Sequence, residues 1–265
     1  MTPELLYDTP QARIAVILVA ALLLASELGY RLARRGRQPH SDLKRTQITS
    51  IQAGLLGLLS LLLGFTFAMA LSRFEYRKQM VVQESNAIGT VALRSQFLPA
   101  SRADEVSGLL GRYVRIRLES VVDTAQASAA RARLDIEATQ LQRRLWHLAH
   151  EAAEADVRSV PLGLLTHSVN ELIDIKTKRD IAVANHVPES VLLFLMGLAV
   201  LAAGVLGYGN GLAGARIISL TAAYSIIVVL AIVLILDLDR PQQGLARVSQ
   251  ASMAQLEELL GQVKR

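Results

Sequence analysis

Four stretches of this 265-residue chain are long, predominantly apolar and almost free of charge. They cover residues 14–30, 48–71, 190–208 and 217–236, and Glu27 is the only Asp, Glu, Lys, Arg or His among them. A helix needs roughly 20 apolar residues to cross the hydrocarbon core of a bilayer. We therefore predict an all-α integral membrane protein with four transmembrane helices. The composition agrees, because 52% of the residues are hydrophobic and 19% are charged.

The four windows group into two hairpins on either side of a long, more polar segment. We predict the following organisation: a first transmembrane hairpin over residues 12–71, a helical extramembrane domain over 72–187, a second transmembrane hairpin over 188–237, and a partly helical tail over 238–265. A cleaved signal peptide is the alternative interpretation of the first window. The basic cluster follows that apolar run instead of preceding it, so we interpret the window as a retained anchor.

The distribution of basic residues predicts the orientation in the membrane. The loop over residues 31–47 carries six Lys or Arg and one acid, whereas the N-terminal flank offers Glu4 and Asp8 before Arg13. Short loops rich in Lys and Arg stay in the cytoplasm. We therefore expect loop 31–47 to be cytoplasmic and domain 72–187 to be external, in the inner membrane of a bacterium. Basic residues that flank the second and third windows on the domain side oppose this assignment.

Prolines divide the extramembrane domain into helices. Gly89 is the only Gly or Pro between residue 72 and Pro99, so one helix is expected from residue 48 to about residue 97, roughly 75 Å long. Further helices are expected over residues 101–124, with Ser101 as N-cap, over 129–157, and from Pro161 onward. Pro188 is expected to start the third span. No segment shows the alternation typical of strands.

One cluster of metal-ligand residue types lies in the helix predicted over residues 129–157. It consists of His147, His150, Glu151 and Glu154, within two helical turns. A metal site in a helical bundle needs a similar group on a second helix, and no second group is present. We interpret the cluster as a solvated face and expect no metal.

The sequence contains no pattern typical of catalysis or cofactor binding. His167 and His186 stand apart from any nucleophile and acid, and no glycine-rich phosphate loop is present. The chain has no cysteine, which excludes disulfides and thiolate ligands. Its net charge of +5 is explained by membrane orientation without a nucleic-acid partner. We expect no enzymatic activity, no cofactor and no nucleic acid.

Small residues recur at intervals of three or four in two of the windows. In the second window they are Ala53, Gly57, Ser60, Gly64, Ala68 and Ser72. In the third they are Ala199, Ala203, Gly207 and Gly211. Such a face either packs tightly against another helix or, in an oligomer, lines a pore around the symmetry axis. No ionisable residue lies at mid-membrane depth, which argues against a proton relay but leaves a passive pore open.

Charged residues gather where the second and fourth windows end. Arg73, Glu75, Arg77 and Lys78 follow the second window, and Asp237, Asp239 and Arg240 follow the fourth. If the hairpins pack together, both groups lie on the same side of the membrane. We expect opposite charges from the two groups to pair there. The alternative is contact with lipid headgroups.

Four segments of the sequence form a specific combination: the run 63–74 (LGFTFAMALSRF), then Glu84, Asn86 and Gly89, then Asn170, Asp174 and Arg179, and then Asp237, Asp239, Arg240 and Pro241. Together they resemble a family of bacterial membrane proteins of unknown function described as bestrophin-like. The resemblance extends over roughly residues 50–250 and implies a four-span membrane protein.

A more distant resemblance connects the chain to bestrophins proper, which are pentameric anion channels with four spans. It rests on the order of hairpin, domain and hairpin, and on Arg73, Phe74, Glu75, Arg77 and Asn86. Bestrophins have a second aromatic before the acid and an Arg three residues after the Asn. Here Glu75 follows Phe74 directly and Gly89 occupies the second place. The bestrophin domain is cytoplasmic, opposite to the orientation that the charges predict here.

Two functional hypotheses follow from these patterns. The first is a homo-oligomer in the lipid bilayer that conducts inorganic anions, with the small-residue face of the second window lining the pore. The second is a non-conducting membrane scaffold whose helical domain binds another protein.

Overall fold

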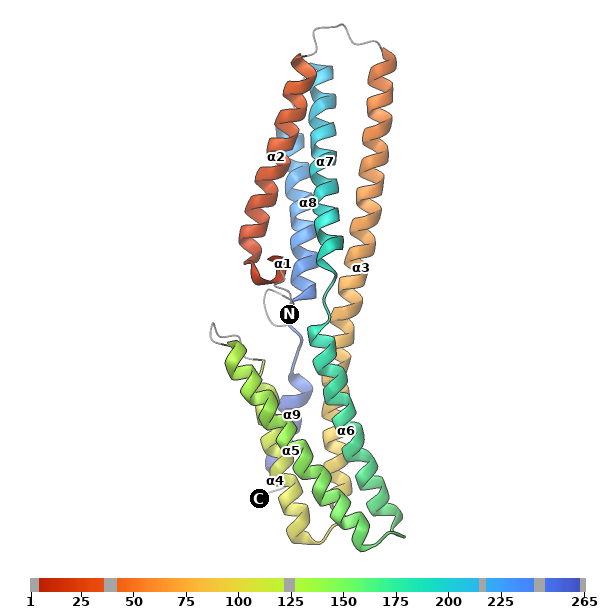
Figure 1. Ribbon diagram of the computed structural model, residues 1–265, viewed down its shortest axis with the longest axis vertical. Helices are drawn as coiled ribbons and strands as arrows, with labels where there is room; N and C mark the ends of the chain where they lie inside the picture. The colour runs from red at the N-terminus through yellow and green to blue at the C-terminus, as the bar shows by residue number, and fades with distance from the viewer. Residues whose placement is uncertain (1–4, 36–41, 122–126, 215–217, 241–245, 263–265) are drawn as a thin grey trace. The chain divides into compact units, whose positions relative to one another are not determined.

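The computed structural model describes residues 5–35, 42–121, 127–214, 218–240 and 246–262, and these residues form helices and no strand (Figure 1). The helices are α1 (Leu5–Asp8), α2 (Gln11–Arg35), α3 (Asp42–Ser95), α4 (Ala100–Glu119), α5 (Ala127–Ala155), α6 (Val160–Ala184), α7 (Glu189–Ala213), α8 (Ile218–Asp239) and α9 (Ala251–Gln262). Helices α2, α3, α7 and α8 cover the four predicted windows except residue 217, which lies outside the described residues, and they are long and apolar enough to cross a membrane. The predicted fold class is confirmed.

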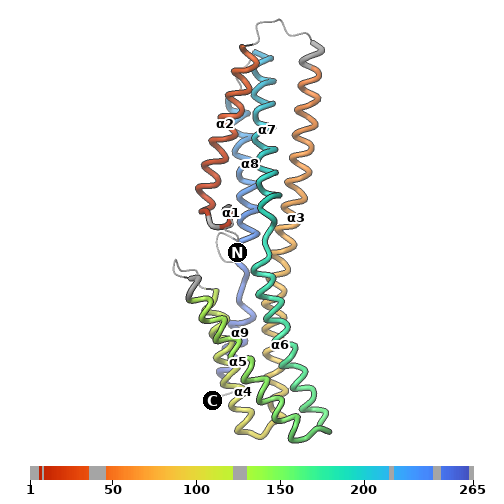
Figure 2. Tube along the Cα trace, viewed as in Figure 1, coloured from red at the N-terminus to blue at the C-terminus, as the bar shows by residue number. Residues whose placement is uncertain are grey.

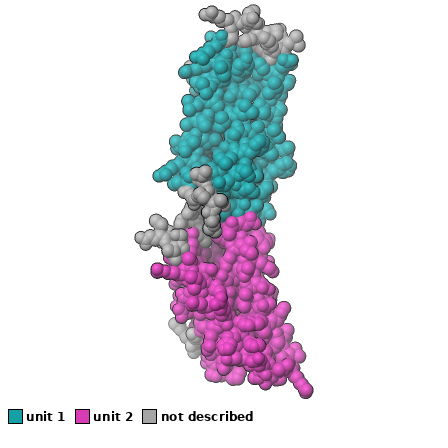
Figure 3. Space-filling model, viewed as in Figure 1, with its two compact units in different colours: residues 1–73, 186–240 teal, residues 74–185, 241–265 magenta. Residues whose placement is uncertain are grey.

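The chain divides into two compact units (Figure 3). Unit 1 consists of Met1–Arg73 and His186–Arg240, and unit 2 of Phe74–Asn185 and Pro241–Arg265. Helix α3 contributes residues to both units, which can be followed along the tube in Figure 2.

Unit 1 contains the membrane helices, and its closest helix pair is α2 with α7. A Cβ atom on Gly207 would lie 2.6 Å from the carbonyl carbon of Ser26, and one on Gly211 would lie 2.7 Å from the carbonyl oxygen of Tyr30. Both distances are shorter than real Cβ contacts, so only glycine permits this approach of the two backbones. The small residues of the third window therefore pack within the chain.

Unit 2 is a helical bundle around one hydrophobic core. Leu110, Leu145, Leu165 and Leu172 are at most 1% exposed and come from three different helices. Helices α4 and α5 run antiparallel, and surface ion pairs join them, including Arg102–Glu151 at 2.9 Å and Arg144–Glu105 at 2.8 Å. Since both pairs are substantially exposed, each contributes at most about 1 kcal/mol. Burial of the leucines supplies more of the stability of the unit.

The prolines end and start helices as predicted, with two corrections. Helix α3 ends at Ser95, shortly before Pro99, and Pro188 is the N-cap of α7. Ser159 caps α6 through a bond from the Leu162 amide. The prediction of Ser101 as an N-cap was wrong, because Pro99 occupies that position and no side chain caps α4. Helix α4 ends at Glu119, before residue 124, and residues 122–126 lie outside the described residues.

Candidate functional site

The predicted small-residue face of the second window lies on the part of α3 in unit 1. All six of its residues are exposed in the chain: Ala53, Gly57, Ser60, Gly64, Ala68 and Ser72. Apart from its chain neighbours and the backbone of its own helix turns, nothing lies within 4 Å of a Cβ built on Gly57 or Gly64. We call these six residues the α3 small-residue face. Unlike the face on α7, it is not packed against any other part of the chain that the structure describes.

Helix α3 instead packs in unit 1 through a different side. Leu59, Thr66 and Ala70 are at most 3% exposed. Residues two apart on a helix point about 160° away from each other, so Gly64 and Thr66 face nearly opposite directions. Gln52 also lies on the packed side, where its Nε2 donates to the Val205 carbonyl of α7 at 2.9 Å. The α3 small-residue face is therefore directed away from the rest of unit 1.

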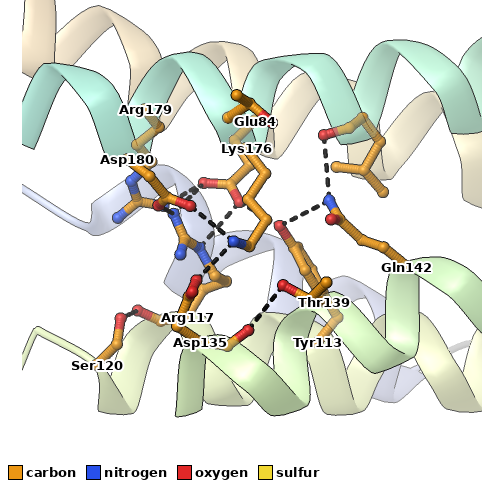
Figure 4. A network of polar contacts seen from close by, with 12 residues as sticks. Glu84, Tyr113, Arg117, Ser120, Asp135, Thr139, Gln142, Lys176, Arg179 and Asp180 are labelled. Atoms are coloured by element: carbon orange, nitrogen blue, oxygen red, sulfur yellow. Dashed lines mark hydrogen bonds and ion pairs between the residues drawn. The ribbon is translucent and has the colours of Figure 1, made fainter. Parts of the chain in front are cut away.

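The second feature is a buried polar cluster in unit 2, centred on Glu84 of α3 (Figure 4). Glu84 is fully buried and accepts a hydrogen bond from the Tyr113 hydroxyl at 2.5 Å. Arg117 approaches it with Nε 2.9 Å from Oε1, and Arg179 donates to Oε2 through Nη1. One carboxylate from α3 thus joins two cations, one from α4 and one from α6. We call Glu84 and its partners the Glu84 network.

The charges of the Glu84 network stabilise one another. Burial alone would raise the pKa of Glu84, but Arg117 and Arg179 outweigh it and hold that pKa below its ordinary value. Burial would lower the pKa of Arg117, yet the Glu84 charge raises it. Burial, and then the Glu84 charge, raise the pKa of Tyr113 well above its usual range. At neutral pH the network therefore holds a carboxylate, two guanidinium groups and a neutral phenol.

Further polar side chains extend the Glu84 network toward the surface of unit 2. Lys176 Nζ donates to Asp135 at 2.5 Å and to Asp180 at 2.7 Å, and Asp180 also accepts from Arg117 at 3.1 Å. Arg179 donates to Gln250 Oε1 at 3.0 Å. The network therefore connects α3, α4, α5 and α6 with the segment before α9. Its buried charges are paired, which such groups need in order to remain ionised away from water.

A third polar cluster lies in unit 1, where α8 ends and α7 begins. Asp239 is fully buried, and it accepts from the Tyr7 hydroxyl and from the Val187 amide, the latter at 2.7 Å. Arg240 donates to the carbonyls of Leu6 at 2.6 Å and Thr9 at 2.7 Å. These bonds tie the N-terminal helix α1 to the ends of α7 and α8. Asp239 and Arg240, which both carry the family resemblance, thus form hydrogen bonds with backbone groups that have no partner within a helix.

The other charged residues at the ends of the second and fourth windows form hydrogen bonds with backbone carbonyls or with a side chain. Arg73 donates to the His186 carbonyl at 2.6 Å, and Arg77 donates to the Ala182 and Asn185 carbonyls at 3.0 and 2.9 Å. Asp237 accepts from Gln11 at 3.3 Å. Pairing between the charges around residue 73 and those around residue 237 stays a prediction.

Four further residues singled out in the sequence are exposed. Asn86, Asn170 and Asp174 are exposed, and Glu75 lies 3.8 Å from Lys78 in an exposed ion pair. Pro241 lies outside the described residues. Of the residues that carry the family resemblance, the structure therefore brings Glu84 and Arg179 together in unit 2, and Asp239 and Arg240 together in unit 1.

Sequence reasoning missed Tyr113 and Arg117, which complete the centre of the Glu84 network. A signal for Arg117 was present, because it continues the apolar face of α4 formed by Val106, Leu110 and Tyr113. A charged residue on such a face indicates a buried partner. Glu84 could not be identified as that partner, since it lies on a different helix.

The histidine cluster of α5 forms two separate pairs. His147 lies 3.0 Å from Glu151 and His150 lies 3.4 Å from Glu154, and all four side chains are exposed. Among the described residues, no group of three or more His, Cys, Asp or Glu is arranged to hold a metal ion. The pairs fit the interpretation as a solvated face.

Comparison with known proteins places this arrangement in a family. The sequence profile of the Bestrophin-like domain matches residues 16–253. The chain belongs to the bestrophin-like family. The match includes the Glu84 network, helices α3, α7 and α8, most of α2, and the residues Asp239 and Arg240. Curated protein sequences include no significant match.

Solved structures of a bacterial bestrophin homolog share the fold. A variant of a bacterial bestrophin homolog from Klebsiella pneumoniae matches with a TM-score of 0.70 at 16% identity, over 96% of this chain and 97% of that one. A second structure of the Klebsiella pneumoniae homolog has a TM-score of 0.67 at 16% identity, over 93% and 95%. At this identity the likeness concerns the fold alone.

Proposed function

We propose that this bestrophin-like membrane protein assembles into a homo-oligomer that conducts inorganic anions, with the α3 small-residue face lining the pathway. The observation that carries the proposal is that this face is exposed along its whole length, with open space at Gly57 and Gly64. Membership of the bestrophin-like family supports it, because the resemblance to bestrophins proper implies a channel.

The chemistry of the α3 small-residue face suits a passive anion pathway. Glycine and alanine leave room along the helix, and the hydroxyls of Ser60 and Ser72 can donate hydrogen bonds to an anion. Rotational symmetry in an oligomer would repeat each hydroxyl around the axis. The face contains no acidic residue, so it presents no fixed negative charge that would repel anions. The proposal assigns no catalytic step to any residue.

We expect Gly64→Leu to abolish anion flux into liposomes that contain the purified protein. A leucine from each subunit would fill a narrow pathway at this level, and the open surroundings of Gly64 let the chain fold around it. Ser60→Ala should change the relative permeability of anions with little effect on folding. Flux is measured with an anion-sensitive dye, and the oligomeric state is measured in the same detergent preparation.

Gly197→Leu on α7 is the matched control. Gly197 is also exposed, with nothing within 4 Å of a built Cβ, but it lies on a different span. We expect this variant to conduct like the unmodified protein. If flux through Gly64→Leu equals that of the control, α3 does not line the pathway. A folded oligomer of the unmodified protein without flux under several ionic conditions would favour the scaffold hypothesis.

For the orientation, we propose that loop 31–47 faces the cytoplasm of a bacterium and that unit 2 is external. The six basic residues in this loop support the assignment. The chain has no cysteine, so a single introduced one reports its own location. We expect Ser101→Cys to react with an impermeant maleimide in intact cells, and Gln47→Cys to react only after lysis; both positions are exposed. The reverse pattern would place unit 2 in the cytoplasm.

A further inference from the structure

A crevice of about 590 Å³ lies between α2, α7 and α8 in unit 1. These are three of the helices long and apolar enough to cross a membrane. Its walls are mostly apolar, with Leu23, Leu24 and Ile218 among them. Leu24 and Ile218 are 63% and 65% exposed, so the crevice opens outward from the helices. In a membrane such an opening faces lipid.

The polar residues of the crevice gather at one end. Glu27 and Arg31 lie in the last turns of α2, Asn210 lies near the end of α7, and Thr221 lies in the first turn of α8. Asn210 is within 3.5 Å of the Thr221 hydroxyl. The apolar wall extends from this end toward the middle of α2, and Ala20 and Arg31 are about 16 Å apart along the helix. The crevice thus has a polar end and an apolar body.

An acid and a base stand side by side at the polar end. Arg31 Nε donates to Glu27 Oε1 at 2.7 Å. Arg31 makes this one bond among the described residues, and its side chain is 66% exposed, so its two terminal nitrogens are available to a ligand. Glu27 is the single charged residue within the four apolar windows. A charged residue inside a membrane helix commonly marks a binding site.

We propose that this crevice binds a glycerophospholipid whose headgroup carries a primary ammonium, as in phosphatidylethanolamine. The ammonium donates hydrogen bonds to the Glu27 carboxylate, and Arg31 donates to the phosphate. An acyl chain lies along the wall of Leu23 and Leu24. The cation and the anion of this headgroup thus each have a side chain of opposite charge at the polar end of the crevice. This inference is independent of anion conduction.

The test is the binding of defined lipids to the purified protein in detergent, measured by native mass spectrometry. Phosphatidylethanolamine and phosphatidylcholine with identical acyl chains differ in the ammonium, since the choline group has no N–H to donate. We expect the ethanolamine lipid to bind about tenfold more tightly, because a hydrogen bond to a charged group is worth about 1.5 kcal/mol. Glu27→Gln should reduce this preference to about twofold.

Arg31→Gln should weaken the binding of both lipids about tenfold, because the contact with the phosphate is lost. Arg13→Gln is the matched control, because Arg13 is exposed at the opposite end of the same helix. We expect it to bind both lipids as the unmodified protein does. Soluble glycerophosphoethanolamine, which lacks acyl chains, should compete at least about a hundredfold less well, since apolar burial contributes about 0.8 kcal/mol per CH₂.

Three outcomes would overturn the proposal. Equal binding of the two lipids to the unmodified protein would exclude recognition of the ammonium by Glu27. Unchanged binding to Arg31→Gln would exclude the phosphate contact. Competition by soluble glycerophosphoethanolamine at the same concentration as the lipid would indicate a headgroup site without an acyl chain in the crevice.

Discussion

Glu84→Gln is expected to lower the free energy of unfolding by about 3–5 kcal/mol, because removing one partner of a buried ion pair leaves its charges uncompensated. Here Arg117 and Arg179, which are 7% and 5% exposed, both lose the Glu84 charge, and among the described residues Arg117 keeps only its contact with Asp180. The apparent melting temperature should fall by at least about 5 °C. Trp146 is the single tryptophan and lies in α5 of the same unit, so its fluorescence reports the transition.

Glu75→Gln is the matched control for this substitution. Glu75 lies on the same helix, is about half exposed, and is 3.8 Å from Lys78. Exposed pairs contribute at most about 1 kcal/mol, so the melting temperature should stay within about 2 °C of the unmodified value. The double variant Glu84→Gln with Arg117→Met removes one of the two cations that lose the Glu84 charge and should recover part of the loss. Equal stability of the Glu84 and Glu75 variants would show that the Glu84 network adds no net stability.

The Glu84 network also predicts how stability depends on pH. The pKa of Glu84 is lowered in the folded chain. Its contribution is therefore fully present above the ordinary carboxyl pKa of about 4.3, and it is lost as the pH falls through the lower folded value. Melting temperatures measured downward from pH 6 should decline in the unmodified protein more steeply than in Glu84→Gln. Parallel curves would contradict this.

Gly207→Ala is expected to destabilise the fold by about 3 kcal/mol, the upper range for an overpacked core. The added Cβ would overlap the Ser26 carbonyl group and lie 2.7 Å from its Cα, and backbone atoms cannot rotate away as a flexible side chain can. Helices α2 and α7 would have to separate, which removes the close contact that holds them together in lipid. The measurement is the apparent melting temperature in detergent, followed as retention of the folded protein after heating.

Gly64→Ala is the control for Gly207→Ala. The same methyl group meets nothing within 4 Å at Gly64. Because alanine favours helix more than glycine does, by about 1 kcal/mol in exposed positions, we expect no loss of stability. Equal losses at the two positions would mean that the α3 small-residue face also packs closely, against another subunit.

Much of the fold follows from local sequence. The four windows predict the membrane helices because only an apolar stretch of sufficient length is stable in hydrocarbon. Pro99, Pro161 and Pro188 mark helix ends because proline has no amide hydrogen and restricts the residue before it. These constraints act within a few residues, so the sequence is sufficient to predict where the membrane helices lie and where helices begin and end. The N-cap at Ser101 was wrong because Pro99 already fixes the start of α4.

The candidate sites depend more strongly on tertiary structure. Glu84 was identified through family resemblance, but its burial and its contacts with Tyr113, Arg117 and Arg179 join residues from three helices. These partners are 29 to 95 positions away along the chain. A local pattern of charges shows that a partner is needed, but not which residue supplies it.

The two ladders of small residues show most clearly what each level decides. The sequence by itself determined four membrane helices and the spacing of small residues on two of them, since both properties repeat within a few turns of one helix. Only the tertiary structure decided that Gly207 lies against α2 whereas Gly64 faces outward. The physical reason is that a small residue permits close approach without selecting a partner. The selection comes from how all the helices of the unit pack together.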